Sequence, residues 1–590
     1  MSHFKRSVYC GLVDEAAIGT IISLAGWVHN RRDLGGLTFV DLRDRTGIIQ
    51  LVFDPTINPQ SCDLAHTLRS EFVIGVQGTV VARSGGVNPK MPTGKIEVQV
   101  SSIEIFSKSQ VLPFQLDDSS PVSEELRLKY RYLDLRRKSI HDFIKLRHDV
   151  VFLMRQYFHD QGFYEIETPM LSKSTLEGAR AFLVPSREHE GSVYALPQSP
   201  QIYKQLLIAA GMEKYFQIAR CFRDEDLRAS RQPEFTQLDI EMSFIDEEEI
   251  QSLCENLMSL IWKKFLNYDI TLPLARYTYG DVFHRFGSDK PDLRFELEIS
   301  DLTTLFEPLP INFLQSVISN GGKVGGLCVK NKQFSRSEID ALTQKVTKEF
   351  GASGMLYIKF KEDGTPESPI AKFLPEKFFD QILQAVPNLS TKDTLLLVAG
   401  SYEDAWTTLG RLRLELGKTL DLIDHSKQSL FWVVDFPMFE WDKNEQRWAA
   451  KHHPFTSPQD GWENLQPGQI KARAYDLVCN GEELGGGSIR IHNSEIQTKV
   501  FDLLGINKEQ AQEHFGFLLE AQNFGYPPDG GVAFGIDRLI MILAGTESIR
   551  DVIAFPKTQS GTCLMMQCPS PADDKQLAEV HLKKMDIKKK

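Results

Sequence analysis

The sequence lacks any long run of apolar residues. No apolar stretch in the 590-residue chain reaches about 18 residues, the length that a helix needs to cross a bilayer. The first residues, M-S-H-F-K-R-S-V-Y-C-G, also lack the apolar segment of a secretory signal peptide. The sequence therefore predicts no membrane span and no export, and we expect a cytoplasmic protein.

Cysteine is also scarce. The eight cysteines are scattered without a C-x-x-C pair, and no His/Cys cluster has the spacing of a zinc site. Scattered cysteines of this kind are typical of reduced thiols in the cytoplasm. We therefore expect neither a disulfide framework nor structural zinc.

An excess of positive charge is missing as well. The chain has 67 Lys+Arg against 79 Asp+Glu, a net charge of −12, which argues mildly against a nucleic-acid partner. Binding depends on local patches rather than on the sum, however. Residues 1–110 hold 11 Lys+Arg and 10 Asp+Glu, a net charge of +1, so this region is free to meet phosphates.

The length and the composition indicate a multidomain globular protein. A chain of 590 residues is too long for one core, so two to four domains are expected. Residues 20–106 contain about five short, mostly alternating segments separated by Gly, Asp or Pro. This pattern suits a small closed barrel of the oligonucleotide-binding type. A barrel with a purely adaptor role is the alternative, and the pattern alone leaves both open.

The spacing of apolar residues changes after a linker at residues 107–125. A helical pattern from residue 126 ends at Gly162, and strand and helix patterns then mix until about residue 290. Residues 296–425 resemble a separate α/β insert. Strand-rich sequence resumes at F-W-V-V-D-F, so the insert interrupts one larger domain.

Residues 220–235, R-C-F-R-D-E-D-L-R-A-S-R-Q-P-E-F, carry an unusual density of charge. Four arginines and four acids lie in a segment that fits neither helical nor strand periodicity. The flanking segments alternate as strands, so the whole predicts a hairpin with a long charged loop. A solvated hairpin tip is the plain alternative, but polar residues also lie deep in both strands, where such a tip needs none.

Residues 530–545, G-G-V-A-F-G-I-D-R-L-I-M-I-L-A-G, predict a strand, a glycine turn and an apolar helix. Arg538 falls in the first turn of that helix, where the helix dipole disfavours a cation. A bound phosphate would compensate it, and Gly535 allows a ligand to approach the backbone. An arginine paired with a local aspartate is the alternative.

Residues 475–490, Y-D-L-V-C-N-G-E-E-L-G-G-G-S-I-R, place two carboxylates on strands that flank a turn. Asp476 and Glu483 are the oxygen ligands that Mg²⁺ takes together with substrate phosphates. Three glycines, Gly485, Gly486 and Gly487, remove side chains where a ligand must lie flat. Arg490 can bind a carboxylate through two parallel hydrogen bonds.

These three segments together resemble a known family. T-P-M at 168–170 resembles motif 1 of the class II aminoacyl-tRNA synthetases, F-R-D-E with R-Q-P-E-F resembles motif 2, and G-I-D-R resembles motif 3. More specifically, the chain resembles the bacterial-type aspartyl-tRNA synthetases. The strings that carry this resemblance, in chain order, are G-W-V-H-N-R-R-D-L-G-G-L-T-F-V-D-L-R-D, R-L-K-Y-R-Y-L-D-L-R-R, A-L-P-Q-S-P-Q, G-A-S-G-M-L-Y-I, H-H-P-F-T-S-P, G-G-G-S-I-R-I-H-N and I-R-D-V-I-A-F-P-K-T.

The resemblance covers almost the whole chain and implies an α+β multidomain fold. An OB-fold barrel would bind the anticodon, and a class II antiparallel-sheet catalytic domain would hold an inserted α/β domain typical of the bacterial enzymes. The implied division is an anticodon-binding domain at 1–110, a hinge at 111–140, the first catalytic part at 141–295, the insertion at 296–425, and the second catalytic part with a C-terminal extension at 426–590.

The resemblance also implies a reaction in two steps. Aspartate attacks the α-phosphorus of ATP to give aspartyl-adenylate and pyrophosphate, and the 3′ end of tRNA-Asp then takes the aspartyl group. The implied catalytic residues are Arg223 and Arg538, with Mg²⁺ held by Asp476 and Glu483. The implied ATP-binding residues are Arg223, Asp224, Glu225, Gln232, Glu483, Gly535, Ile536, Asp537 and Arg538.

For the amino acid, the resemblance implies that Lys204 and Arg490 bind the side-chain carboxylate of aspartate. Glu177 matches a mobile loop that closes over the amino acid, and Leu176 stands where many relatives carry proline. Asp239 matches the pocket for the α-ammonium group. The implied aspartate-binding residues are Glu177, Ser199, Gln201, Lys204, Arg223, Asp239, His452 and Arg490.

For the tRNA, Phe39 matches an aromatic residue that stacks on an anticodon base, and Arg32 and Gln50 match neighbours that bind the base edges. Residues 226–231 match the contact with the acceptor end, through Arg228 or Arg231. The family also implies a homodimer.

Four alternatives remain. An asparaginyl-tRNA synthetase shares the architecture, but Lys204 and Arg490 together favour an anionic side chain. A catalytically inactive tRNA-binding paralog predicts the loss of an ATP or Mg²⁺ residue, and none is lost. An amide-forming ligase on the same fold would not need the barrel. Finally, some bacterial relatives charge both tRNA-Asp and tRNA-Asn, and the sequence does not distinguish these two cases.

Overall fold

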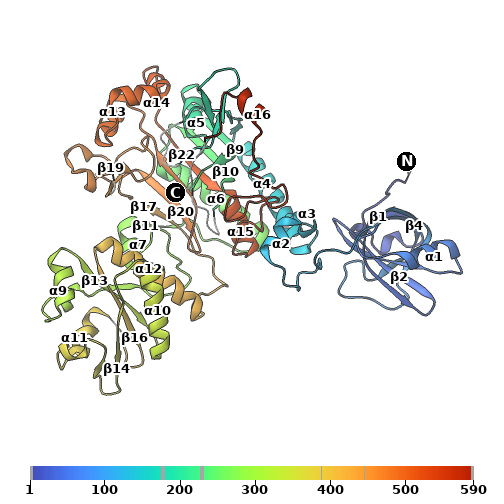
Figure 1. The fold of residues 1–590 in the computed structure, drawn as a ribbon, viewed down its shortest axis with the longest axis horizontal. Coiled ribbons are helices and arrows are strands. Elements are labelled where there is room, and N and C mark those ends of the chain that lie inside the picture. The colour runs from blue at the N-terminus through green and yellow to red at the C-terminus, as the bar shows by residue number, and fades with distance from the viewer. Residues whose placement is uncertain (1–3, 175–179, 226–230, 387, 444, 586–590) are drawn as a thin grey trace. The chain divides into compact units, whose positions relative to one another are not determined.

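The computed structural model in Figure 1 describes residues 4–174, 180–225, 231–386, 388–443 and 445–585. The packing of the chain divides it into two compact units, Met1–Ser120 and Pro121–Lys590. Within the described ranges, no helix is both long and apolar enough to cross a membrane.

The first unit is a closed barrel with the strand order β1-β2-β3-β5-β4. In β2, Val40 and Leu42 point into the barrel and are fully buried, whereas Phe39 and Arg43 on the other face are only partly buried. The predicted five-stranded barrel is therefore confirmed. Its elements are β1 (Ile21–Leu34), β2 (Leu37–Asp44), β3 (Gly47–Phe53), α1 (Pro59–Thr67), β4 (Val73–Ala82) and β5 (Ile96–Ser107).

The second unit is built on an eight-stranded sheet with the order β11-β17-β20-β21-β22-β10-β9-β6. The neighbouring strands pair antiparallel except at the two edges, where β11 pairs with β17 and β6 with β9 in parallel. The charged loop of the sequence joins β9 to β10, as predicted. The strands are β6 (Tyr164–Glu165), β9 (Lys214–Phe222), β10 (Glu234–Ser243), β11 (Ala275–Thr278), β17 (Leu430–Val434), β20 (Ala474–Cys479), β21 (Glu482–Ile489) and β22 (Asp529–Gly535).

Three helices, α4 (Lys138–Asp160), α6 (Glu247–Leu266) and α15 (Ile536–Ala544), share the main hydrophobic core with this sheet. Both ends of α6 are capped, because Asp246 and Glu249 form a capping box and Asn267 ends the helix in a left-handed conformation. The other elements are α2 (Glu124–Lys129), α3 (Arg131–Asp134), β7 (Leu183–Pro185), β8 (Val193–Ala195), α5 (Gln201–Ala209), α7 (Tyr279–Phe286), β18 (Phe439–Asp442), β19 (Arg447–Ala450), α13 (Ser494–Leu503), α14 (Lys508–Gln522) and α16 (Asp574–Glu579).

The insertion forms its own five-stranded sheet, with the order β12-β13-β16-β14-β15 and helices packed around it (Figure 1). Two separate apolar clusters pack against this sheet. The α/β character of the insert is confirmed, whereas the exact five-part domain division stays a prediction. Its elements are β12 (Ile299–Asp301), α8 (Thr303–Phe306), α9 (Asn312–Ser319), β13 (Lys323–Val329), α10 (Arg336–Lys348), β14 (Leu356–Phe360), β15 (Pro366–Glu367), α11 (Phe378–Ala385), β16 (Thr394–Gly400) and α12 (Tyr402–Thr419).

Candidate active site

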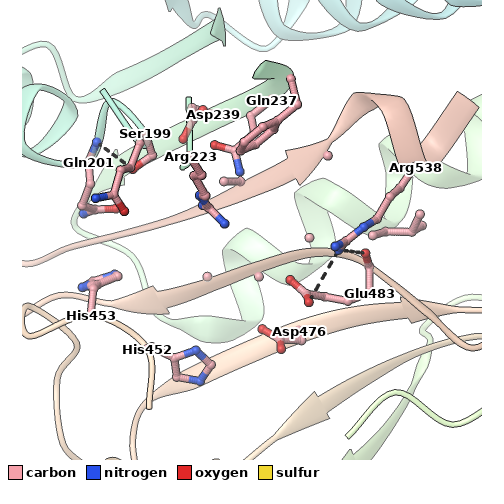
Figure 2. A pocket seen from close by; sticks show the side chains of 18 of the residues that line it. Ser199, Gln201, Arg223, Gln237, Asp239, His452, His453, Asp476, Glu483 and Arg538 are labelled. Atoms are coloured by element: carbon pink, nitrogen blue, oxygen red, sulfur yellow. Dashed lines mark hydrogen bonds and ion pairs between the residues drawn. The ribbon is translucent and has the colours of Figure 1, made fainter. Parts of the chain in front are cut away.

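A cavity of about 560 Å³ opens over the middle strands of the large sheet. Side chains from α5, the β9–β10 hairpin, β20, β21, β22 and the start of α15 line it. Figure 2 labels ten of the lining residues. The three charged or glycine-rich segments of the sequence, which lie up to about 300 residues apart, therefore meet in one pocket.

Arg223 enters this pocket from the end of the β9–β10 hairpin. Its backbone N–H donates to the carbonyl of Pro233 at 2.9 Å, and its guanidinium lies 5.2 Å from the centre of the Phe235 ring. The Nε atom of Arg223 is buried and has no hydrogen-bond partner among the described residues. A buried, unpartnered donor on a charged group favours a bound anion at this place.

The other predicted ATP residues of the hairpin are held by protein contacts. Glu225 pairs with Arg231 at 2.9 Å, and both line the pocket. The side-chain amide of Gln232 accepts from the backbone N–H of Lys557 at 2.7 Å and donates to its carbonyl at 3.0 Å. Asp224 uses its backbone N–H to bind the carbonyl of Arg180 at 3.0 Å. Arg228 lies outside the described residues.

The start of α15 presents Arg538 to the pocket. Nη1 of Arg538 donates to the Glu483 carbonyl at 2.9 Å and lies 3.6 Å from the Glu483 carboxylate. Gly535 is the N-cap and supplies no side-chain cap, so the helix N-terminus stays open to a ligand. The predicted alternative, a pair with a local aspartate, is wrong, because Asp537 binds Arg147 and the backbone N–H of Thr236 instead.

Two residues predicted for ATP binding, Ile536 and Asp537, also hold α15 in place. Ile536 is fully buried in the main hydrophobic core. The carboxylate of Asp537 fastens α15 to α4 through Arg147 and to β10 through Thr236. Any contact that Ile536 makes with a nucleotide would therefore use its backbone.

Asp476 and Glu483 face each other across the β20–β21 turn, next to Arg538 (Figure 2). Burial raises the pKa of Asp476 well above its usual value, and the neighbouring charges of Glu483 and Asp289 raise it further. Gly486 is needed here, because a Cβ atom on it would lie 2.4 Å from Oδ1 of Asp476. The acids are thus held where a cation would relieve their repulsion.

Lys204 and Arg490 lie together at the opposite end of the pocket, and both are 2% exposed. Nζ of Lys204 is 3.2 Å from Glu241 and 3.4 Å from Asp239. Nε and Nη2 of Arg490 donate to the two oxygens of Glu241 at 2.7 and 3.1 Å. Two buried cations therefore stand beside two buried carboxylates.

The pKa values of this cluster follow from burial and pairing. Burial raises the pKa of Glu241, but the charges of Arg490 and Lys204 outweigh it and leave the pKa lowered. For Arg490, burial lowers the pKa and the paired Glu241 more than reverses the change. Asp239 keeps a raised pKa because burial exceeds the effect of Lys204, and its Oδ2 has no partner among the described residues.

Two adjacent histidines complete this end. Burial lowers the pKa of His452 to about 4, so the ring is neutral near pH 7, and its Nε2 has no partner within the described part of the chain. Nη1 of Arg490 lies 2.7 Å from Nε2 of His453, and burial together with Arg490 lowers the pKa of that ring as well. The histidine that contacts Arg490 is therefore His453 and not the predicted His452.

The remaining predicted residues of the amino-acid end also line the cavity. Ser199 accepts from the backbone N–H of Gln201 at 3.3 Å, at the start of α5, and the Gln201 side chain donates to Gln205 at 3.2 Å. Glu177 and Leu176 lie outside the described residues. The cavity also includes side chains that the sequence reasoning did not assign: Gln198, Gln237, Asp289, Lys451, His453 and Ser488.

Glu241 is the largest omission, because it holds both of the buried cations. Its signal was present, since Glu241 follows Asp239 by two residues and both point to the same side of β10. Its contact with Arg490 has no local signal, because the two residues are 249 positions apart in the chain.

The predicted anticodon residues lie together on the outer side of the barrel. Phe39 of β2 is paired directly with Arg32 of β1, and Asp41 is paired with Gln50 of β3. Nη2 of Arg32 donates to Asp41 at 3.0 Å and to Gln50 at 3.1 Å. The Gln50 amide then donates to Glu97 at 2.8 Å. A half-buried ring thus lies beside a connected polar network.

Comparison with known proteins agrees with this geometry. Residues 123–559 match the family model of tRNA synthetases class II (D, K and N), and residues 22–106 match that of the OB-fold nucleic acid binding domain. An aspartate–tRNA(Asp/Asn) ligase of Anoxybacillus flavithermus is 50% identical over 99% of this chain and 100% of its own length. An aspartate–tRNA ligase of Staphylococcus carnosus is 49% identical over 98% of this chain and 99% of its own.

Among solved structures, the asparaginyl-tRNA synthetase of Pyrococcus horikoshii with asparaginyl-adenylate has a TM-score of 0.59. It covers 94% of this chain and 98% of its own at 19% identity, which shows a shared fold. The sequence identity to the ligases is much higher and spans both units. From the matched motifs and from these relatives, the chain belongs to the bacterial aspartate–tRNA ligases within the class II aminoacyl-tRNA synthetases.

Proposed function

We propose that the pocket of the second unit activates L-aspartate with ATP and then transfers it to the 3′ end of tRNA-Asp. The observation that carries this proposal is the buried pair Lys204 and Arg490. Two desolvated cations at one end of a cavity favour an anionic side chain, because a neutral one would pair less well with the N–H groups that their protein carboxylates leave over.

The hydrogen-bond inventory supports an aspartate carboxylate between these cations. Lys204 has three N–H groups, and two carboxylates lie within reach of its Nζ. Arg490 has five N–H groups, and Glu241, Ser488 and His453 take up four. Each cation therefore keeps a donor for the substrate. The unpartnered Oδ2 of Asp239 suits the α-ammonium group, together with Ser199 and Gln201.

At the other end, Arg223 and Arg538 suit the ATP phosphates. Arg223 lies between the two ends of the cavity, where an α-phosphate must stand if aspartate is to attack it. Its role is to stabilise the negative charge that develops on that phosphate in the transition state. Glu225 and Gln232 at the hairpin would border the adenine, and the open N-terminus of α15 would face the outer phosphates.

The acids Asp476 and Glu483 suit Mg²⁺. Two carboxylates on rigid strands, completed by substrate phosphate oxygens, are the ligand set that this ion takes in nucleotide sites. Among the residues that the structure describes, no group of three or more His, Cys, Asp or Glu side chains is arranged to hold a metal by itself. Bound Mg²⁺ would neutralise charge on the phosphates, while Arg538 and the two acids fix their position.

In the first step an oxygen of the aspartate α-carboxylate attacks the α-phosphorus, and the bond to the β-phosphate oxygen breaks. In the second step the terminal ribose hydroxyl attacks the aspartyl carbonyl, and AMP leaves. The chain contributes orientation and charge stabilisation, because side chains fixed in buried pairs would hold the aspartate and Arg223 would hold the α-phosphate.

We further propose that the outer barrel surface around Phe39, Arg32 and Gln50 binds the anticodon and that the loop at Arg231 meets the acceptor end. We infer a homodimer that works in the cytoplasm, where tRNA is charged. Large exposed side chains on and next to α4, Phe152 at 62% and Tyr164 at 63%, support a contact between subunits. Sedimentation as a monomer at micromolar concentration would contradict it.

Aminoacylation of purified tRNA-Asp and tRNA-Asn with labelled aspartate tests the proposal. Charging of tRNA-Asp is expected, and labelled asparagine serves as the control amino acid that the two cations should reject. Charging of neither tRNA would overturn the proposal. The tRNA-Asn arm measures whether this chain resembles the relatives named for tRNA(Asp/Asn) or those named for aspartate–tRNA ligation alone.

A further inference from the structure

The segment after motif 3 contains two cysteines that face each other across a short turn. Cys563 and Cys568 form an isolated antiparallel bridge, in which the N–H of Cys563 donates to the Cys568 carbonyl at 2.8 Å and the N–H of Cys568 returns a bond at 3.3 Å. Residues paired in this way have Cα atoms about 5.5 Å apart and side chains on one side. A disulfide needs a Cα separation of about 4.4–6.8 Å.

The ammonium group of Lys557 lies near the two thiols. The pKa of Lys557 is raised, because the hydrogen bond and charge of Glu234, with smaller contributions from Cys568 and Cys563, outweigh the lowering by burial. The ammonium group of Lys557 is thus close enough to interact with both sulfurs. Sγ of Cys563 also accepts from the backbone N–H of Met566 at 3.4 Å.

Access to the two sulfurs differs. Cys563 is buried at 8% exposure, whereas Cys568 is half-buried. The other six cysteines of the chain are all buried. Cys568 is therefore the thiol of this pair that a small oxidant in solution meets first, and Cys563 lies behind it as a second thiol.

We propose that Cys563 and Cys568 form a reversible disulfide when the protein meets a peroxide, and that this disulfide weakens ATP binding. The sulfur of Cys568 attacks one oxygen of hydrogen peroxide, the O–O bond breaks, and a sulfenic acid and one water form. The sulfur of Cys563 then attacks the sulfenic sulfur, the S–O bond breaks, and a second water leaves. Both sulfurs are oxidised, the peroxide is reduced, and the two thiol protons end in the two waters.

A short path leads from this pair to the ATP end of the pocket. Thr562, next to Cys563, accepts from the backbone N–H of Thr558 at 2.8 Å, and their hydroxyl groups lie 2.7 Å apart. Thr558 follows Lys557, whose backbone holds both polar groups of the Gln232 side chain. A bond to Cys568 takes Sγ of Cys563 away from the N–H of Met566. We expect this change to shift the turn and, through Lys557, the backbone groups that hold Gln232.

The experiment uses the full chain, treated with hydrogen peroxide, blocked with N-ethylmaleimide and digested with trypsin without reductant. Residues 559–574 contain no Lys or Arg, so both cysteines stay in one peptide. In the wild type we expect this peptide to be unalkylated and two hydrogens lighter than the reduced form, and dithiothreitol should restore both thiols. We expect the KM for ATP in pyrophosphate exchange to rise severalfold and to recover with the thiols.

Cys568→Ser is the test variant, and its KM for ATP is expected not to respond to peroxide. Met566→Leu is the matched control, because it removes an exposed, oxidisable sulfur from the same turn and keeps the pair; it should behave as wild type. Two alkylated cysteines after peroxide would overturn the disulfide. A disulfide without a change in KM, or an equal change in Cys568→Ser, would overturn its link to ATP.

The expected rise in the KM for ATP rests on the proposed function, whereas the mass of the peptide does not. A reduced wild type with no pyrophosphate exchange would therefore count against the proposed function and leave the disulfide testable.

Discussion

The pocket of the second unit and the outer surface of the barrel handle charge in opposite ways. In the pocket, Lys204 and Arg490 are 2% exposed and their carboxylate partners are fully buried. On the barrel, the Arg32 side chain is 49% exposed and its partner Asp41 is 12% exposed. Both surfaces carry arginines paired with acids, and the two surfaces differ in how deeply these pairs are buried.

This difference shows how each surface can recognise its ligand. A buried charge that loses its partner leaves the other charge desolvated, so a small substrate that fits is strongly distinguished from one that does not. An exposed pair contributes little by itself, because water and salt screen it. Recognition on the barrel must then add up many modest contacts over several bases. Variants in the two regions should therefore differ in the size and in the kind of their effects.

The largest effect is expected for Arg490→Ala. The change removes the proposed contact to the aspartate carboxylate and leaves Glu241 with Lys204 alone, at a cost of about 3–5 kcal/mol in the free energy of unfolding. Pyrophosphate exchange with aspartate should fall below detection, and chemical denaturation should show the loss of stability.

The double variant Arg490→Met with Glu241→Leu is its control. Replacing a buried ion pair by apolar side chains is often neutral for stability, so the double variant should regain much of the stability and stay inactive. A double variant no more stable than Arg490→Ala would contradict the pairing as the source of the loss.

The next effect is expected for Arg538→Ala. Loss of one positioned donor to a developing charge slows catalysis by about 100- to 1,000-fold, so pyrophosphate exchange should drop by that factor, while tRNA binding on filters stays near wild type. Arg538→Lys keeps the charge but loses the planar guanidinium, so its rate of pyrophosphate exchange should lie between those of the wild type and Arg538→Ala. If tRNA binding fell by the same factor as pyrophosphate exchange, a specific role of Arg538 in binding ATP would be contradicted.

Asp476→Asn should separate activity from stability. The pKa of Asp476 is raised in the folded state, because burial and the charges of Glu483 and Asp289 oppose ionisation. For an acid shifted upward, stability is lost as the pH rises from the unfolded pKa through the folded one. At pH 7 without Mg²⁺ the wild type therefore carries a penalty that asparagine lacks.

We accordingly expect Asp476→Asn to abolish pyrophosphate exchange and to raise the midpoint of thermal unfolding at pH 7. The gain should shrink near pH 4, close to the unfolded pKa of about 3.9, where both proteins are largely uncharged at this position. Thermal scans at the two pH values measure it. A variant less stable than the wild type at pH 7 would contradict the assigned repulsion.

The sequence predicted the elements of both regions well, because they depend on local signals. The alternating pattern in residues 20–106 predicted the barrel, and the glycine turn before Ile536 predicted the strand and the helix that present Arg538. Periodicity and turn chemistry act over a few residues, so one sequence contains them. Matching motifs then indicated which of these elements would meet in one pocket.

Partners brought together only by the tertiary fold could not be predicted in the same way. Glu241 meets Arg490 from 249 positions away in the chain, and Gln232 meets Lys557 from 325 positions away. Neither pair has a local pattern that marks it. Similarly, Asp537 lines the pocket as its predicted ATP role requires, but the tie that it also makes between two helices through Arg147 has no local signal.

The smallest effect is expected for Phe39→Ala on the barrel. Stacking of an aromatic ring on a base is worth about 1–3 kcal/mol, or roughly 5- to 150-fold in affinity. The KM for tRNA in aminoacylation should rise by that factor, while pyrophosphate exchange, which needs no tRNA, stays unchanged. Phe106→Ala is the matched control, because this ring of the same barrel is 39% exposed and packs edge-on against Phe4. Its loss should leave the KM for tRNA near wild type. If Phe39→Ala slowed pyrophosphate exchange as strongly as charging, the two regions would not divide the work between tRNA and aspartate, and the contrast between buried and exposed charge would lose its functional meaning.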